Sequence, residues 1–119
     1  MAKVVDIYAL PVPLKHLAAY RAMSRAVGRI FRKHGATEYR EFAAPQQAMK
    51  GVRPFTAGVR LRTGEVLVIA IVTYPSAAAR KRINAAIEAD PKLSAMTPDP
   101  DMFDMKRMTV SSFETIVEV

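Results

Sequence analysis

The sequence predicts an α+β fold: a ferredoxin-like βαββαβ arrangement, with a four-stranded antiparallel sheet and two helices on one face. Segments suited to strands and helices follow one another in the order strand, helix, strand, strand, helix, strand. Prolines and glycines separate most of these segments. The length of 119 residues, half of them hydrophobic, fits one domain, which we expect to span residues 1–119.

The first strand and the first helix are separated by two prolines. Residues 4–10 are β-branched and aromatic enough for a strand, and Pro11 and Pro13 are expected to end it. Pro13 suits a helix start, because its missing N–H is not needed there. Residues 14–34 contain no proline and a single glycine, which predicts a long helix with Gly35 in the left-handed position just beyond its end.

This first helix has one apolar side and one basic side. At 100° per residue, five large side chains share one face: Tyr20, Met23, Val27, Ile30 and Phe31. Four basic side chains share the opposite side: Arg21, Arg25, Arg29 and Arg32. The pattern is typical of a helix that lies on a sheet with its charges in water.

The middle of the chain holds two further strands. Residues 37–42 alternate enough for the second strand. Residues 43–64 are irregular and are interpreted as a loop with a possible short strand around residues 56–61. Residues 65–74 form the strongest strand, which is apolar on both faces, so both faces must be covered.

The last third supplies the second helix and the last strand. Ser76 is a good N-cap for a helix over residues 77–89, and Asp90 begins a further turn over residues 92–96. Residues 106–119 are expected to form the last strand.

The apolar strand over residues 65–74 has consequences for assembly. Two helices cover one face of the predicted sheet and leave the other bare. A second copy packing its sheet on that face would give a two-fold homodimer. A monomer covered by its own C-terminal segment is the competing arrangement.

Composition excludes several kinds of function. The absence of cysteine excludes disulfides, thiolate zinc sites, iron–sulfur clusters and cysteine nucleophiles. The longest apolar run, residues 66–72, is far short of the roughly 20 residues that span a bilayer. Because Asp6 lies where a signal peptide would be apolar, we expect a cytoplasmic protein without a membrane partner. No cofactor is expected.

The net charge of +7 is unevenly distributed. Residues 1–64 hold twelve basic and three acidic side chains, whereas residues 65–119 hold six and eight. A basic half can bind an anionic partner or can be a solvated helix face. The pattern argues against nucleic-acid binding of the RRM kind, because residues 66–73 offer no aromatic side chains for base stacking. A weaker alternative is that the arginines of the first helix bind nucleic-acid phosphates without sequence specificity.

Two residues of the first helix are candidates for catalysis in the cleft between helix and sheet. His34 either meets the helix dipole at the C-terminus or points into the cleft as an acid, a base or a ligand contact. Tyr20 lies on the inward face, as a core aromatic or as a polar group of the cleft.

Other polar residues have weaker claims to function. Tyr74 and Arg80 are candidate ligand contacts, Tyr74 at the rim of the cleft and Arg80 for an anion. His16 and His34 lie about 27 Å apart along the helix, so they cannot share a metal, and no metal site is expected. Asp6 and Arg107 are plausible ion-pair partners if their strands pair.

Several segments have the spacing of one family. They are Val5-Asp6 with Pro11-Val12-Pro13, residues 19–23, residues 34–41, Tyr74-Pro75-Ser76 with Arg80, Asn84, Asp90-Pro91 and Met96, and residues 103–108 with 113–119. Together they resemble the YbaA-like family of small uncharacterised bacterial proteins. The resemblance implies a dimeric α/β-barrel, in which two ferredoxin-like subunits pack their sheets face to face, and it implies no activity.

The chain departs from this family at two places. Ser111-Ser112 replace a usual glycine pair, and Ile69-Ala70-Ile71 replace an often aromatic stretch, so a pocket there would be less aromatic. Dimeric α/β-barrels include oxygenases, isomerases and haem-degrading proteins that use the helix–sheet cleft. By that analogy of fold alone, we expect a homodimer that binds a small molecule there, as a cofactor-independent oxygenase or isomerase. The alternative is a structural or regulatory dimer without catalysis.

Overall fold

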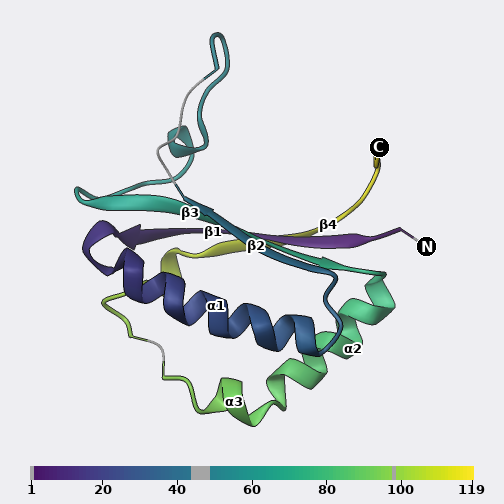
Figure 1. The fold of residues 1–119 in the computed structure, drawn as a ribbon. Helices are drawn as coiled ribbons and strands as arrows, with labels where there is room; N and C mark the ends of the chain where they lie inside the picture. The colour runs from purple at the N-terminus through teal and green to yellow at the C-terminus, as the bar shows by residue number, and fades with distance from the viewer. Residues whose placement is uncertain (1, 44–48, 98) are drawn as a thin grey trace.

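The computed structural model describes residues 2–43, 49–97 and 99–119. It confirms the predicted ferredoxin-like fold: a four-stranded antiparallel sheet in the order β2-β3-β1-β4 (Figure 1). The elements are β1 Val4–Pro13, α1 Leu17–Lys33, β2 Glu38–Ala43, β3 Glu65–Tyr74, α2 Ala77–Glu88, the short α3 Pro91–Ser94 and β4 Thr109–Glu114. Three single 3₁₀ turns lie at Leu14–His16, Phe55–Ala57 and Met105–Arg107.

The two central strands, β1 and β3, pair along their whole length, from Val4 opposite Tyr74 to Pro13 opposite Glu65. Because side chains alternate along a strand, the even-numbered residues of both strands face the helices. They form most of the core with Tyr20, Ile30 and Ile83 from the helices, and their buried apolar members are Val4, Leu10, Val12, Val66, Val68, Ala70, Val72 and Tyr74.

β1 continues through both prolines to Pro13, so the prediction that they end the strand is wrong. β4 pairs with β1 only as far as Ala9. Beyond Ala9, β1 has a neighbouring strand only on its β3 side. On the side of β1 that has no neighbouring strand, a backbone nitrogen has no hydrogen bond to donate. A strand tolerates proline at such positions, because proline has no N–H.

α1 begins after one 3₁₀ turn and ends as predicted. His34 is its C-terminal cap, and Gly35 follows with a φ of 115°, a conformation that side chains disfavour. The predicted apolar face points to the sheet: Tyr20 and Ile30 are buried, Met23 and Phe31 pack against the core, and Val27 is partly buried.

Two strand predictions are wrong: one predicted strand does not form, and another is shorter than predicted. Residues 56–61 form no strand; instead a 3₁₀ turn spans Phe55–Ala57, closed by hydrogen bonds from Ala57 N to Pro54 O and from Gly58 N to Phe55 O. The last strand covers only Thr109–Glu114 rather than residues 106–119. Its end follows from the register, because Glu114 lies opposite Val4, where β1 begins.

The face of the sheet opposite the helices carries an apolar patch, which we call the open face. Figure 1 shows all three helices on one side, with the segment of residues 49–64 and the C-terminal residues projecting on the other. We call residues 49–64 the arm. By strand alternation the apolar residues of the open face are Val5, Ile7, Ala9, Pro11, Phe42, Leu67, Ile69, Ile71 and Phe113, of which Pro11 and Leu67 are buried.

Candidate functional site

A cavity of about 340 Å³ lies between α1, the sheet and the segment that follows α3. Its walls are mainly apolar side chains from four sources: Met23, Val27 and Phe31 of α1; Leu10, Ala70 and Val72 of the sheet; Leu93 of α3; and Met96, Phe103, Met105 and Met108 of the segment that follows α3. A mostly apolar cavity of this size with a few polar groups is typical of a small-molecule site.

The polar groups of the cavity gather around one carboxylate. The Tyr20 hydroxyl donates to Glu41 Oε1 at 2.5 Å, and the Tyr39 hydroxyl donates to Glu41 Oε2 at 2.6 Å. Burial raises the pKa of both tyrosines, and the adjacent Glu41 carboxylate raises each further. Both hydroxyls therefore remain protonated at neutral pH, so each can donate a hydrogen bond to Glu41 or to a ligand.

Local structure explains why these three side chains meet. Tyr39 and Glu41 are two residues apart in β2, so they point to the same face of the sheet, toward α1. Gly28 of α1 leaves room for the Tyr39 ring: a Cβ at Gly28 would lie 2.6 Å from Tyr39 Cδ1. Tyr20 is held from the other side by Phe103, edge-to-face with ring centroids 6.0 Å apart.

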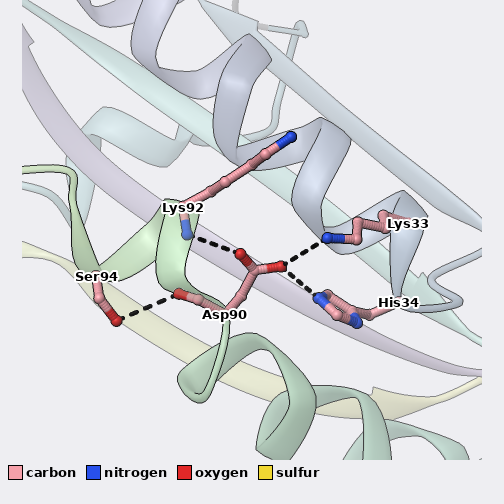
Figure 2. A network of polar contacts seen from close by, with 5 residues as sticks. All are labelled: Lys33, His34, Asp90, Lys92 and Ser94. Carbon is pink, nitrogen blue, oxygen red and sulfur yellow. Dashed lines mark hydrogen bonds and ion pairs between the residues drawn. The ribbon is translucent and has the colours of Figure 1, made fainter.

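His34 lies outside the lining of this cavity, in a contact between the end of α1 and the start of α3. Its Nε2 is 2.6 Å from Asp90 Oδ2, which also accepts from Lys33 Nζ at 3.3 Å. Figure 2 shows this network, in which the other oxygen of Asp90 accepts from the backbone of Lys92 at 2.9 Å. The Asp90 side chain is only 1% exposed. These contacts favour a structural role for His34 in joining the two helices.

The Asp90 network makes stability depend on pH in the acid range. The hydrogen bond from His34, followed by that from the Lys92 backbone, lowers the pKa of Asp90 to about 2. A lowered pKa stabilises the fold at pH values above the ordinary carboxyl range, and this stabilisation is lost as pH falls from about 4 to about 2. We expect Asp90→Asn to lower the melting temperature at neutral pH and to flatten its fall across that window, as measured by circular dichroism.

Asp101→Asn is the matched control, because it removes an exposed carboxylate that forms no ion pair among the described residues. It should leave the neutral melting temperature and its acid dependence as in the wild type. If Asp90→Asn melted like this control at every pH, the contact with His34 would contribute nothing to stability.

Tyr74 and Arg80 are also engaged away from the cavity lining. Tyr74 is fully buried, and its hydroxyl donates to Asn84 Oδ1 at 3.2 Å. Burial raises its pKa. Arg80 Nε lies 2.8 Å and 3.0 Å from the two oxygens of Asp6, which is buried beneath α2. The hydrogen bond to Asp6 raises the pKa of Arg80.

The predicted ion pair of Asp6 with Arg107 is wrong. Asp6 lies opposite Ser112 and Val72 and faces α2, where Arg80 reaches it. Arg107 lies before β4 and binds Glu65, with Nη1 2.6 Å from Oε2 and Nη2 2.8 Å from Oε1. These bonds lower the pKa of Glu65 to about 2.

Of the four candidate site residues, only Tyr20 lines the cavity. Tyr39 and Glu41 are not among the candidates predicted from the sequence, although one signal could have found them. An acidic residue two positions from an aromatic one, in a strand that alternates, places a carboxylate on the same face as a core side chain.

Among the described residues, no group of three or more histidines, cysteines or acidic side chains is placed to hold a metal ion. In the same residues, no helix has both the length and the apolar character needed to cross a membrane.

Comparison with solved structures identifies the same fold in proteins of very different sequence. A dimeric ferredoxin-like protein from an uncultured marine organism is 9% identical with a TM-score of 0.63, and each chain is covered completely. A Bacillus cereus protein whose proposed assignment is antibiotic biosynthesis monooxygenase is 13% identical with a TM-score of 0.58, covering 100% of this chain and 98% of its own. An Agrobacterium tumefaciens nipsnap family protein of unknown function is 14% identical with a TM-score of 0.59, covering 96% and 88%.

At these identities the similarity shows the fold alone. No match was found among curated proteins. A family model described as "Protein of unknown function (DUF1428)" matches residues 3–114, nearly the whole chain. This match confirms the sequence-based expectation that the chain belongs to an uncharacterised family. The chain belongs to the DUF1428 family.

Proposed function

We propose that this protein binds a small, mostly apolar molecule in the cavity between α1 and the sheet. The observation that carries the proposal is the combination of about 340 Å³ of apolar-walled space with a hydrogen-bonded polar end at Glu41. An apolar ligand gains affinity by leaving water, and a polar group on it can exchange hydrogen bonds with the two tyrosine hydroxyls.

In this proposal Tyr20, Tyr39 and Glu41 contact the ligand. His34 joins α1 to α3 through Asp90. Tyr74 and Arg80 hold α2 against the sheet through Asn84 and Asp6, respectively. Among the residues that the structure describes, Glu41 is the single carboxylate that lines the cavity, so it is the group placed to take a proton from a bound molecule. The Bacillus cereus protein of the same fold, whose proposed assignment is monooxygenase, supports a small-molecule function by analogy of fold.

Binding is tested with N-phenylnaphthylamine, an uncharged probe whose fluorescence rises in apolar surroundings. Ala70 lines the cavity and is only 6% exposed, so Ala70→Phe places a ring in the space that the probe would occupy. We expect the wild type to bind the probe and Ala70→Phe to weaken binding by roughly tenfold or more.

Ala22→Phe is the control, because it makes the same change on the exposed side of α1. Its probe affinity should equal that of the wild type. Circular dichroism verifies that both variants are folded. Undiminished binding to Ala70→Phe would place the probe elsewhere and contradict the proposal.

We further propose a cytoplasmic homodimer in which two open faces pack together, as in the dimeric α/β-barrel that the sequence resemblance implies. The open face is apolar along both central strands. The arm and the C-terminal residues flank it and expose further large apolar side chains: Met49, Val52, Phe55, Ile116 and Val117. Contiguous apolar surface of this kind marks an interface, and the marine ferredoxin-like protein is dimeric.

Ile71 lies at the middle of the open face, opposite Ile7 and Arg40. A lysine there would bury an unpaired charge in the interface, so we expect Ile71→Lys to sediment as a monomer where the wild type sediments as a dimer. Ala78→Lys, on the exposed side of α2, should remain dimeric. A wild type that sediments as a monomer at micromolar concentration would contradict the homodimer.

A structural or regulatory dimer without a ligand is the second candidate, favoured by the same open face. The two experiments separate these functions. A dimer that fails to bind the probe supports the second candidate. A dimer that binds the probe, and whose binding is weakened by Ala70→Phe, supports the first.

A further inference from the structure

The basic side of α1 borders a groove of about 540 Å³ between this helix and β2. All four arginines of that side line it: Arg21, Arg25, Arg29 and Arg32. The groove is more open to solvent than the apolar cavity, and it continues along most of α1. The charged side of the helix thus faces a defined recess.

The charges in this groove are unbalanced. Four guanidinium groups line it against a single carboxylate, Glu41. In the described part of the chain, Arg21, Arg25 and Arg29 take part in no salt bridge. Like charges four residues apart on a helix repel one another, so the groove has a positive potential that a bound anion would relieve.

The groove and the apolar cavity share one wall. Tyr20, Ser24, Tyr39 and Glu41 line both of them. Both oxygens of Glu41 accept hydrogen bonds from tyrosines, which stabilise its negative charge on the side where the two spaces meet. The polar end of the apolar cavity is therefore also the inner border of the arginine groove.

On the basis of the proposed function, we infer that the ligand is an amphipathic anion. Its apolar body fills the cavity, and a single carboxylate, sulfonate or phosphate group lies in the groove against Arg21 and Arg25. These two arginines flank Ser24, one of the residues that border both spaces. Guanidinium groups suit this task, because their planar array of donors matches the oxygens of such anions.

Nucleic acid fits this groove less well. Single strands bind through bases that stack on exposed aromatic rings. The aromatic residues here are Tyr20, which is only 6% exposed, and Tyr39, which packs against Phe31 with ring centroids 5.5 Å apart. Neither offers a free face to a base.

The test uses two fluorescent probes with the same ring system. Anilinonaphthalene sulfonate carries an anionic group, and N-phenylnaphthylamine does not. Their affinities are measured on the wild type, on Arg21→Gln/Arg25→Gln and on Lys81→Gln/Arg82→Gln. The last variant removes two positive charges from α2, at residues that do not line the groove.

We expect the wild type to bind the sulfonate about fivefold or more tightly than the neutral probe. Arg21→Gln/Arg25→Gln should abolish this preference without changing the affinity of the neutral probe, whereas Lys81→Gln/Arg82→Gln should keep it. Added sodium chloride should weaken sulfonate binding to the wild type and to Lys81→Gln/Arg82→Gln. It should leave sulfonate binding to Arg21→Gln/Arg25→Gln, and binding of the neutral probe to every variant, unchanged.

Each other outcome has a definite meaning. Failure of the neutral probe to bind contradicts the proposed function itself. Binding of the neutral probe without a preference for the sulfonate, or a preference that survives in Arg21→Gln/Arg25→Gln, overturns the anionic ligand and leaves the cavity intact. Binding of a short DNA duplex that depends on the same two arginines would assign the groove to a phosphate backbone and would also overturn it.

Discussion

Arg80→Met is expected to destabilise the protein by about 3 kcal/mol, the largest effect among the stability variants considered. Arg80 holds both oxygens of Asp6, and Asp6 is 1% exposed in the space between β1 and α2. Methionine keeps the apolar stem and removes the guanidinium, so the loss comes from leaving a buried carboxylate without its cation. Chemical denaturation at neutral pH measures the change.

Asp6→Asn/Arg80→Met separates the cost of the orphaned charge from the loss of packing. This double variant leaves no orphaned carboxylate at position 6, so it should be more stable than Arg80→Met alone, although it has one more substitution. Arg82→Met, which removes an exposed arginine from the same helix, should melt like the wild type. Equal stabilities of Arg80→Met and Arg82→Met would show that the Asp6 contact has no stabilising role.

Gly28→Ala is expected to lower stability by about 2 kcal/mol, opposite to the usual effect of this change within a helix. Alanine is normally favoured over glycine there, but its Cβ would lie 2.6 Å from Cδ1 and 2.9 Å from Cε1 of Tyr39. The Tyr39 ring cannot easily retreat, since it packs against Phe31 and its hydroxyl is bonded to Glu41. The neutral probe should also bind more weakly, because Tyr39 lines the cavity.

Two comparisons isolate the clash. Gly58→Ala should be near neutral, because the closest atom to its Cβ is Phe55 O at 3.8 Å. In a background of Tyr39→Leu, which removes the ring, Gly28→Ala should cost little or should stabilise. A Gly28→Ala protein that is as stable as the wild type would show that the ring is free to move.

The fold was predictable because its signals are local. The apolar run before Tyr74, the N-cap at Ser76 and the glycine at position 35 each act on neighbouring residues, and each is confirmed. The end of β1 was not predictable in the same way. Whether proline is tolerated at position 11 depends on where β4 stops, and that register is set by residues about a hundred positions away.

The same distinction applies to the candidate site. The helical phase of Tyr20 pointed it toward the sheet, and it does line the cavity. Glu41 is different, because an alternating strand shows which residues share a face but not which face meets the helices. Likewise, the sequence suggested only Arg107 as the partner of Asp6, and it is the packing of α2 on the sheet that brings Arg80 to Asp6 instead.

The strand order also determines when the sheet can begin to assemble. Among the strands described, β1 pairs only with β3 and β4, and β2 pairs only with β3. Neither early strand has a partner until residues 65–74 exist, so on the ribosome the first half of the chain can form helix but no sheet. Closing β1 onto β3 then requires a loop of about fifty residues, the kind of distant contact that slows folding. Until β3 is complete and pairs with β1, which places Tyr74 opposite Val4, the apolar residues of β1 have no sheet partner and need protection from aggregation.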